Sequence, residues 1–385
     1  MHFIQIMHSR FFVKIWTFVG LVVVLGACQT QPQSPQGDPS PSSDLAYATT
    51  FSLAESDSGT ALTIHTPWSG NSQGMHYFLH PKDQATPSLP DSVKAIAVPV
   101  ERLVCYSTTH LPYLAMLHAE DALVAYPGTQ YISTPSVKER VEHGQVRELG
   151  SDRSINPEVL LDTQPDVVMM FALDGPGAEY DQIQNSGTPV IFNADYLEEH
   201  ALGRTEYIKL FGALLGKEEE ATKIFAEIEM DFNTLLGSIH TIQKPTVFSG
   251  VVYGDTWFTP GADSWAADFI TRAGGQYLYA DHPGSGTLPL SFESVYAKCL
   301  DADYWIGVGS YTSKEELLAA DARYEDFAAV QSGQVYSYMK RADPNGGVPY
   351  FELGYARPDL VLSDVIKILE PESQPDSLNF FIRLN

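Results

Sequence analysis

One uninterrupted helical pattern most constrains how this chain can fold. Between residues 217 and 236, apolar side chains recur at the three- and four-residue spacing of one helical face, with neither Gly nor Pro inside the run. Three glutamates, 218–220, stand at its amino end, where the helix dipole favours negative charge. A helix of roughly 24 residues spans about 36 Å. The pattern therefore predicts a rigid spine, within residues 201–243, that is long enough to cross a small domain.

A similar stretch of sequence occurs on each side of this predicted spine. In each copy a capping residue opens a short helix, a Glu follows at the second helical position, and an Asp turn leads into a buried strand. The capping residue, the Glu and the Asp are Asn156, Glu158 and Asp166 upstream, and Ser291, Glu293 and Asp303 downstream. The sequence therefore predicts two similar halves, one on each side of the helix.

Length and charge limit the classes of partner. The chain has 385 residues, of which 44% are hydrophobic, enough for two cores. Its formal charge is −25, so nucleic acid and anionic membrane surfaces are not expected to bind it directly.

The N-terminus predicts export and lipidation. Arg10 and Lys14 precede an apolar run, residues 15–25, that is short for a membrane span and typical of a signal peptide. The run ends in Leu-Gly-Ala-Cys, which resembles a bacterial lipobox with Cys28 as the lipidated residue. We therefore predict a signal peptide at 1–27, a polar tether at 28–44 and a membrane lipid anchor. The alternative is an ordinary signal sequence or anchor helix with an incidental cysteine.

The alternation of strands and helices sets the predicted fold class. Residues 45–92 are β-like and form a small extension of unknown role. Residues 93–200 and 244–385 alternate strands with helices, which indicates mostly parallel sheets. The predicted strands are 94–99, 102–106, 123–126, 146–149, 167–171 and 190–193 in the first lobe, and 246–253, 257–259, 277–280, 304–308 and 335–339 in the second. The predicted fold is α/β: two Rossmann-like lobes joined by a single long spine helix, with a small N-terminal β extension. Cys105 and Cys299 fall in different lobes and are expected to be buried free thiols.

From about residue 95 to 369 the chain resembles the cluster III periplasmic substrate-binding lipoproteins of ABC importers for iron complexes and vitamin B12. The resemblance depends on the order and spacing of several landmarks. They are Arg102-Leu-Val-Cys-Tyr, Asn156-Pro-Glu158, Gln164-Pro-Asp166-Val-Val, the spine, Ala273-Gly-Gly and Ser291-Phe-Glu293. The resemblance implies a monomeric binding protein, not an enzyme, that captures a ligand and delivers it to a membrane permease served by an ATPase.

The resemblance also implies a role for Glu158 and Glu293. In that family one Glu on each lobe pairs with arginines of the permease. The alternative is that each Glu has only a structural role in the first turn of a helix, where the helix dipole stabilises an acidic side chain by about 0.3–1 kcal/mol. Their identical position in both halves favours docking.

Ligand contacts in such a fold are expected in loops at the carboxyl ends of the strands. Aromatic side chains there suit a flat or bulky ligand, and an Arg suits a carboxylate or an oxygen-rich ferric chelate. The predicted contacts are Tyr106, Thr108, His110, Asp152, Arg153 and Phe171 in the first lobe, and Tyr253, Trp257, His282 and Arg341 in the second, with Tyr350 as a further candidate. A core or loop-structural role remains open for each.

The sequence leaves the ligand open. Vitamin B12 binders of the family often place a Trp before each docking Glu, and neither stretch has one here. Siderophore binders often place an Arg near Arg153, which favours a ferric siderophore. Haem remains an alternative through Tyr106, His110 or Tyr253. No cofactor is predicted.

Two other classes of protein compete with this hypothesis. A bare zinc or manganese binder would use side chains such as His110, His143, His200, Asp281 and His282, but no two of them have metal-ligand spacing. An enzyme would need a nucleophile elbow, a phosphate loop or a zinc-protease motif, and the sequence contains none.

Overall fold

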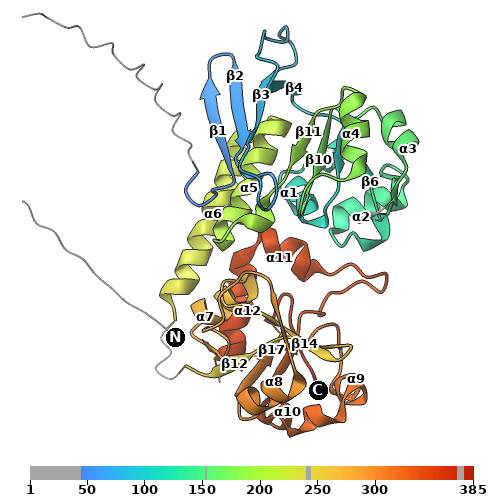
Figure 1. Ribbon diagram of the computed structural model, residues 1–385. Helices are drawn as coiled ribbons and strands as arrows, with labels where there is room; N and C mark the ends of the chain where they lie inside the picture. Colours follow the sequence, from blue (N-terminus) through green and yellow to red (C-terminus); the bar gives the residue numbers. More distant parts are fainter. Residues whose placement is uncertain (1–44, 152–153, 240–243, 371–376) are drawn as a thin grey trace, which may run out of the picture. The chain divides into compact units, whose positions relative to one another are not determined.

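The first lobe is built on a parallel sheet. The structure, a computed structural model, describes residues 45–151, 154–239, 244–370 and 377–385. Five parallel strands form a sheet in the order β11-β10-β5-β6-β7, and helices connect them along the chain (Figure 1). The strands are β5 (Leu103–Cys105), β6 (Leu123–Tyr126), β7 (Arg147–Glu148), β10 (Val167–Met170) and β11 (Val190–Phe192), and the helices are α1 (Leu111–Met116), α2 (Pro135–Glu142), α3 (Pro157–Asp162) and α4 (Ala178–Asn185). Two antiparallel strands of two residues each, β8 (Gly150–Ser151) and β9 (Ser154–Ile155), precede α3.

The second lobe has the same arrangement around its first strand but differs at the edges of its sheet. Its sheet has the order β15-β12-β17-β18-β19, and only β19 is antiparallel to its neighbour. The strands are β12 (Thr246–Phe248), β15 (Gln276–Tyr277), β17 (Tyr304–Ile306), β18 (Val335–Ser337) and β19 (Ile382–Arg383), and the helices are α7 (Trp265–Arg272), α8 (Phe292–Cys299), α9 (Lys314–Ala320), α10 (Ala328–Gln331), α11 (Leu353–Ala356) and α12 (Pro358–Leu369). In both sheets the first strand stands between the second strand and the strand that follows the Glu-bearing helix.

The Asp turns carry the same contact in both lobes. The Asp166 carboxylate, just before β10, accepts hydrogen bonds from the backbone N–H groups of Glu101 and Arg102 at 2.9 and 3.0 Å. The Asp303 carboxylate, just before β17, accepts hydrogen bonds from the N–H and the hydroxyl of Thr246, both at 2.7 Å. Each Asp therefore fixes the start of the neighbouring central strand, β5 or β12.

The spine consists of two packed helices, α5 (Ala201–Leu215) and α6 (Glu218–Gly237) (Figure 1). Gly216 ends α5 in the left-handed conformation, φ +66°, which reverses the chain into α6. A Cβ on Gly212 would lie 2.6 Å from the Cβ of Ala221, so a glycine permits this close packing. The predicted continuous helix is α6, which has 20 residues and is about 30 Å long, somewhat shorter than the roughly 24 residues expected. Helix α12 packs against it.

The N-terminal extension is a four-stranded sheet in the order β1-β2-β3-β4. Its strands are β1 (Phe51–Ser56), β2 (Gly59–Ile64), β3 (Met75–Pro81) and β4 (Val93–Val98). We predicted the strand at 94–99 as part of the first lobe, and this assignment is wrong. Strand β4 pairs in parallel with β3, with Tyr77 opposite Lys94, and so belongs to the extension.

The predicted strand 246–253 is also wrong as a single element. It breaks at Gly250, whose φ is +87°, and a Cβ there would lie 2.0 Å from the carbonyl oxygen of Phe258. After the break the chain enters a separate antiparallel sheet in the order β13-β14-β16. Its strands are β13 (Val251–Tyr253), β14 (Thr256–Pro260) and β16 (Thr287–Leu290).

Cys105 and Cys299 are buried free thiols, as expected, and burial raises the pKa of Cys299 to about 11. Among the residues described, no helix combines the length and the apolar character that crossing a bilayer requires. The predicted signal peptide, tether and Cys28 lie outside the described residues.

Candidate functional site

An aromatic pocket lies at the carboxyl ends of three strands in the second lobe. It has a volume of about 270 Å³ and is bounded where β12, β17 and β18 end. The rings of Tyr338 and Tyr350 stack with centroids 5.2 Å apart and an interplanar angle of 12°, and Phe351 meets Tyr338 edge-on at 4.8 Å. Its other lining residues include Ser249, Gly250, Phe258, Phe269, Gly307, Gly309 and Phe381. We call this the aromatic pocket, and its chemistry suits a flat, largely apolar surface.

A polar cluster lies at the carboxyl end of β11 in the first lobe. The side-chain oxygen of Asn193 accepts a hydrogen bond from the backbone N–H of Asp195 at 2.8 Å. Asn193 Nδ2 and one Asp195 carboxylate oxygen are buried without a hydrogen-bond partner among the described residues. Burial raises the pKa of Asp195, and the nearby Arg204 guanidinium opposes that rise. The Arg204 guanidinium also lies 4.7 Å from the ring centroid of Tyr355, which belongs to α11.

Our sequence reasoning missed most of these residues. Ligand contacts were expected in loops at the carboxyl ends of strands, and the end of the predicted strand 190–193 is such a place. Considering that loop would have found Asn193 and Asp195. Tyr338 was missed because it lay inside the predicted strand 335–339, whereas β18 ends at Ser337. Tyr350, a further candidate, does line the aromatic pocket.

Three predicted contacts follow β5 in the first lobe. His110 is fully buried, and neither ring nitrogen has a hydrogen-bond partner in the part of the chain that is described. Burial lowers its pKa to about 3, so the ring is neutral near pH 7. Tyr106 is buried with its hydroxyl likewise unpaired, and burial raises its pKa. Thr108 is half-buried in a short 3₁₀ helix with His110.

Four other predicted contacts are on the surface or close to it. Phe171, after β10, is 39% exposed, and Tyr253, at the end of β13, is 82% exposed. The Nδ1 atom of His282 lies 2.8 Å from a carboxylate oxygen of Asp281, and this pair is partly exposed. Arg341 is exposed. Asp152 and Arg153 lie outside the described residues.

Trp257 lies in the core of the second lobe. Its side chain is 0% exposed and stacks on Trp305 with ring centroids 5.3 Å apart. Its indole N–H donates a hydrogen bond to the carbonyl oxygen of Ser249 at 3.2 Å. The next residue, Phe258, faces the other way and lines the aromatic pocket. In this position Trp257 supports the pocket from behind, so we do not retain it as a ligand contact.

The two candidate docking acids occupy the same place in each lobe. Glu158 and Glu293 are the second residues of α3 and α8, and both are exposed. The next element after each helix is a strand of the lobe sheet, β10 after α3 and β17 after α8, and helix and strand run in opposite directions. The amino ends of both helices, and with them both acids, therefore lie toward the carboxyl ends of the strands.

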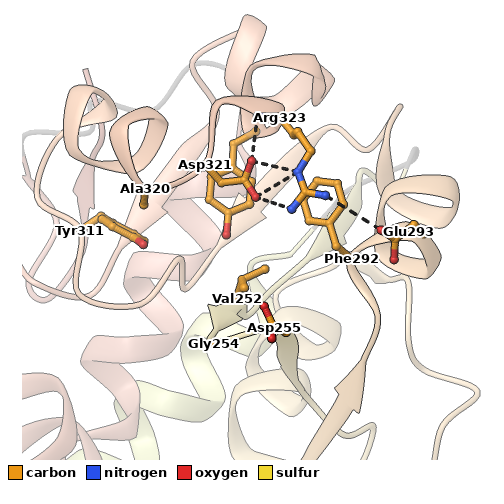
Figure 2. A pocket seen from close by; sticks show the side chains of 10 residues that line it. Val252, Gly254, Asp255, Phe292, Glu293, Tyr311, Ala320, Asp321 and Arg323 are labelled. Carbon is orange, nitrogen blue, oxygen red and sulfur yellow. Dashed lines mark hydrogen bonds and ion pairs between the residues drawn. The ribbon is translucent and has the colours of Figure 1, made fainter.

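A second, polar pocket of about 390 Å³ adjoins Glu293 (Figure 2). Arg323 lies over the ring of Phe292, 3.7 Å from its centroid, and pairs with Asp321 through an Nη2–Oδ2 contact of 2.6 Å. The Arg323 guanidinium lowers the pKa of the Asp321 carboxyl group. The Arg323 Nη1 atom is 3.9 Å from a Glu293 carboxylate oxygen. Glu293, the candidate docking acid of the second lobe, therefore lies beside the Arg323 cation.

The histidines considered for a metal site do not form one in the residues described. No group of three or more His, Cys, Asp or Glu side chains there could hold a metal ion. The Nδ1 atom of His143 lies 2.8 Å from the backbone oxygen of Glu139, and Nδ1 of His200 accepts a hydrogen bond from the N–H of Leu202.

Comparisons with known proteins identify similar chains. A family model described as "Periplasmic binding protein" matches residues 103–342. An uncharacterized lipoprotein of Methanocaldococcus jannaschii is 25% identical over 331 residues, which cover 81% of this chain and 77% of the relative.

Two solved structures resemble this fold. A periplasmic heme binding protein of Pseudomonas aeruginosa matches with a TM-score of 0.58 and 18% identity, over 74% of this chain and 98% of that one. A periplasmic vitamin B12 binding protein of Vibrio cholerae matches with a TM-score of 0.50 and 17% identity, over 70% of this chain and 97% of that one.

Proposed function

We propose that this chain, which belongs to the periplasmic binding protein family, is the substrate-binding component of an ABC importer. That family binds solutes and is not a family of enzymes. In this proposal the chain captures an iron complex, a ferric siderophore or haem, or cobalamin between its lobes and delivers it to a permease. The similarity of the fold to a periplasmic heme binding protein and a periplasmic vitamin B12 binding protein supports this range of ligands.

The observation that carries the proposal is the aromatic pocket. Its stacked tyrosines and Phe351 form an apolar wall where the strands of the second sheet end, which is the usual place for a ligand in an open α/β sheet. Such a wall suits a macrocycle better than a bare ion. Haem or a corrinoid is therefore favoured over zinc or manganese. The ferric siderophore remains supported by Arg153, which we propose as a contact from the sequence alone.

The first lobe is proposed to contribute from the opposite side of the ligand. Phe171, which is exposed after β10, would supply an apolar contact from the first lobe. Tyr253 on β13 would add an aromatic ring from the second lobe. Asn193 and Asp195 are buried, so their unpaired atoms would act from behind these side chains and would not touch the ligand directly. Tyr106 and His110 are also buried and would act from behind Phe171 in the same way.

Glu158 and Glu293 are proposed to dock on arginines of the permease. Their matched positions in α3 and α8 and their exposure support this role. We further propose that lipidation at Cys28 holds the mature protein at a membrane, in keeping with relatives named as lipoproteins.

A thermal-shift screen tests the choice of ligand. The mature protein would be heated with hemin, cyanocobalamin, cobinamide, ferrichrome or zinc, because only a true ligand raises the melting temperature by mass action. We expect one of the first four to stabilise the protein, and Phe351→Ala to reduce that shift. Met230→Ala, which alters an exposed residue of α6, is the control. Stabilisation by zinc alone would replace the proposal with a metal-ion binder.

Charge reversal tests docking separately. We expect Glu158→Lys and Glu293→Lys to abolish ligand uptake by cells while the purified variants keep wild-type affinity. Glu219→Lys, which changes an exposed first-turn acid of α6, is the matched control and should leave uptake unchanged. Loss of ligand binding in either purified docking variant would refute the assignment.

A further inference from the structure

The N-terminal extension packs on the edge of the first-lobe sheet. The hydroxyl of Tyr77, on β3, donates a hydrogen bond to the carbonyl oxygen of Val190 at 2.6 Å. Trp68, in the loop between β2 and β3, meets Phe192 edge-on with ring centroids 5.2 Å apart. Both partners belong to β11, the edge strand of the lobe sheet. The extension therefore reaches the carboxyl end of that sheet.

The loop at residues 65–74 of the extension is hydrogen-bonded to two loops of the lobe. The backbone N–H of Ser69 donates a hydrogen bond to the carbonyl oxygen of Leu173 at 3.2 Å and lies 3.2 Å from the hydroxyl oxygen of Tyr196. The Tyr196 hydroxyl donates in turn to the carbonyl oxygen of Ala172 at 2.7 Å. Three segments that are far apart in the sequence therefore meet at one phenol: the extension loop, the loop after β10 and the segment after β11.

These bonds hold the backbone of Ala172 and Leu173, a segment that carries two exposed apolar side chains. Ala172 is 5% exposed, whereas its neighbours Phe171 and Leu173 are 39% and 58% exposed. Two exposed apolar side chains become a candidate binding surface where they lie together at the end of a sheet at which ligands bind. Both lie just beyond the carboxyl end of β10, on the side of the sheet where the proposed ligand contacts of the first lobe lie.

We propose that the extension is part of the ligand-binding site. Its loop at 65–74 holds the backbone at 172–173, so that Phe171 and Leu173 form an apolar rim at the end of β10. The ligand class this rim fits is a large molecule with an apolar face, such as a tetrapyrrole. This inference rests on the proposed function. A merely protective extension would cover the edge of β11 and would leave affinity independent of the Tyr196 hydroxyl.

Three single substitutions test this role. Tyr196→Phe removes the hydroxyl group that joins the loops and keeps the ring, and Leu173→Ala removes one side chain of the rim. Tyr180→Phe is the matched control, because its ring also packs on Phe192, at 5.3 Å, while its hydroxyl accepts a hydrogen bond from Gln184 instead. Each purified protein would be titrated with hemin and with cyanocobalamin, with intrinsic tryptophan fluorescence as the readout.

We expect Tyr196→Phe and Leu173→Ala each to weaken binding of the probe that wild type binds by about five- to tenfold, since each removes about one contact of ordinary strength. Tyr180→Phe should bind as wild type does. Wild-type affinity in both test variants, or an equal loss in Tyr180→Phe, would overturn the inference alone. If wild type binds neither probe, the tetrapyrrole assignment of this rim is overturned, and binding of ferrichrome then separates that result from failure of the proposed function.

Discussion

Glu352 joins two segments of the chain that are 218 residues apart, and its removal should be among the most damaging single changes. The side chain is 1% exposed and precedes α11. Its carboxylate accepts hydrogen bonds from the N–H and hydroxyl of Ser133, at 2.9 and 2.7 Å, and from the N–H of Thr134 at 2.7 Å. The hydroxyl of Thr134 donates a fourth hydrogen bond. The substitution to test is Glu352→Ala.

The expected cost follows from the donors that are left behind. The two hydroxyl groups can rotate toward other acceptors, but the two backbone N–H groups cannot move. A buried donor without an acceptor costs about 1–3 kcal/mol. The Thr134 N–H is buried and the Ser133 N–H is only partly buried, so the first should account for most of the loss, about 1–3 kcal/mol, and the second for less. Glu352→Gln keeps one oxygen acceptor in place and should cost less. Glu325→Ala removes an exposed Glu and should change the free energy of unfolding by less than about 0.5 kcal/mol.

Urea unfolding followed by circular dichroism measures this cost. The midpoint for Glu352→Ala should fall while the slope of free energy against urea stays constant, which shows that stability changed and not the surface exposed on unfolding. The order of stability should be wild type and Glu325→Ala together, then Glu352→Gln, then Glu352→Ala. A loss below about 1 kcal/mol in Glu352→Ala would refute the reasoning, because it would mean that the stranded donors find water or another acceptor.

Two further predictions concern His110 and the two faces of strand β14. His110→Phe should weaken the dependence of stability on acid: the folded-state pKa of about 3 lies below the unfolded value of about 6.5, so wild type loses stability as pH falls through that interval. Equal changes in unfolding free energy between pH 7 and pH 4 for both proteins would contradict this. Trp257→Ala should cost about 3–5 kcal/mol in the same assay, as expected for a large buried side chain. Phe258→Ala should instead weaken hemin binding with little loss of stability, and the reverse result would mean that the two faces of β14 are misassigned.

The local order of elements could be predicted from the sequence because it depends on short-range rules. The helical period and the absence of Gly and Pro fix α6, and the caps at Asn156 and Ser291 fix the starts of α3 and α8. The repeated Asp turn gave two similar halves, and the structure shows how: each Asp binds the start of the neighbouring central strand. These contacts form close to the strand and helix ends that the sequence marks.

The candidate site was predicted less well because its residues come together only when distant segments pack. Trp257 and Phe258 are neighbours in one strand, and the sequence shows that they face opposite ways without showing which face meets the core. The aromatic pocket needs Tyr350 to stack on Tyr338 across a loop, and the polar cluster needs Arg204 on α5 to reach Tyr355 on α11.

Short-range patterns along the chain were enough to predict the α/β class, the continuous helix α6 and the paired glutamates, because backbone periodicity and capping act over a few residues. Only the tertiary structure placed β4 in the extension, turned Trp257 inward and brought Ser69 to Leu173, because strand pairing and side-chain burial depend on which surfaces, far apart in the chain, exclude water from one another.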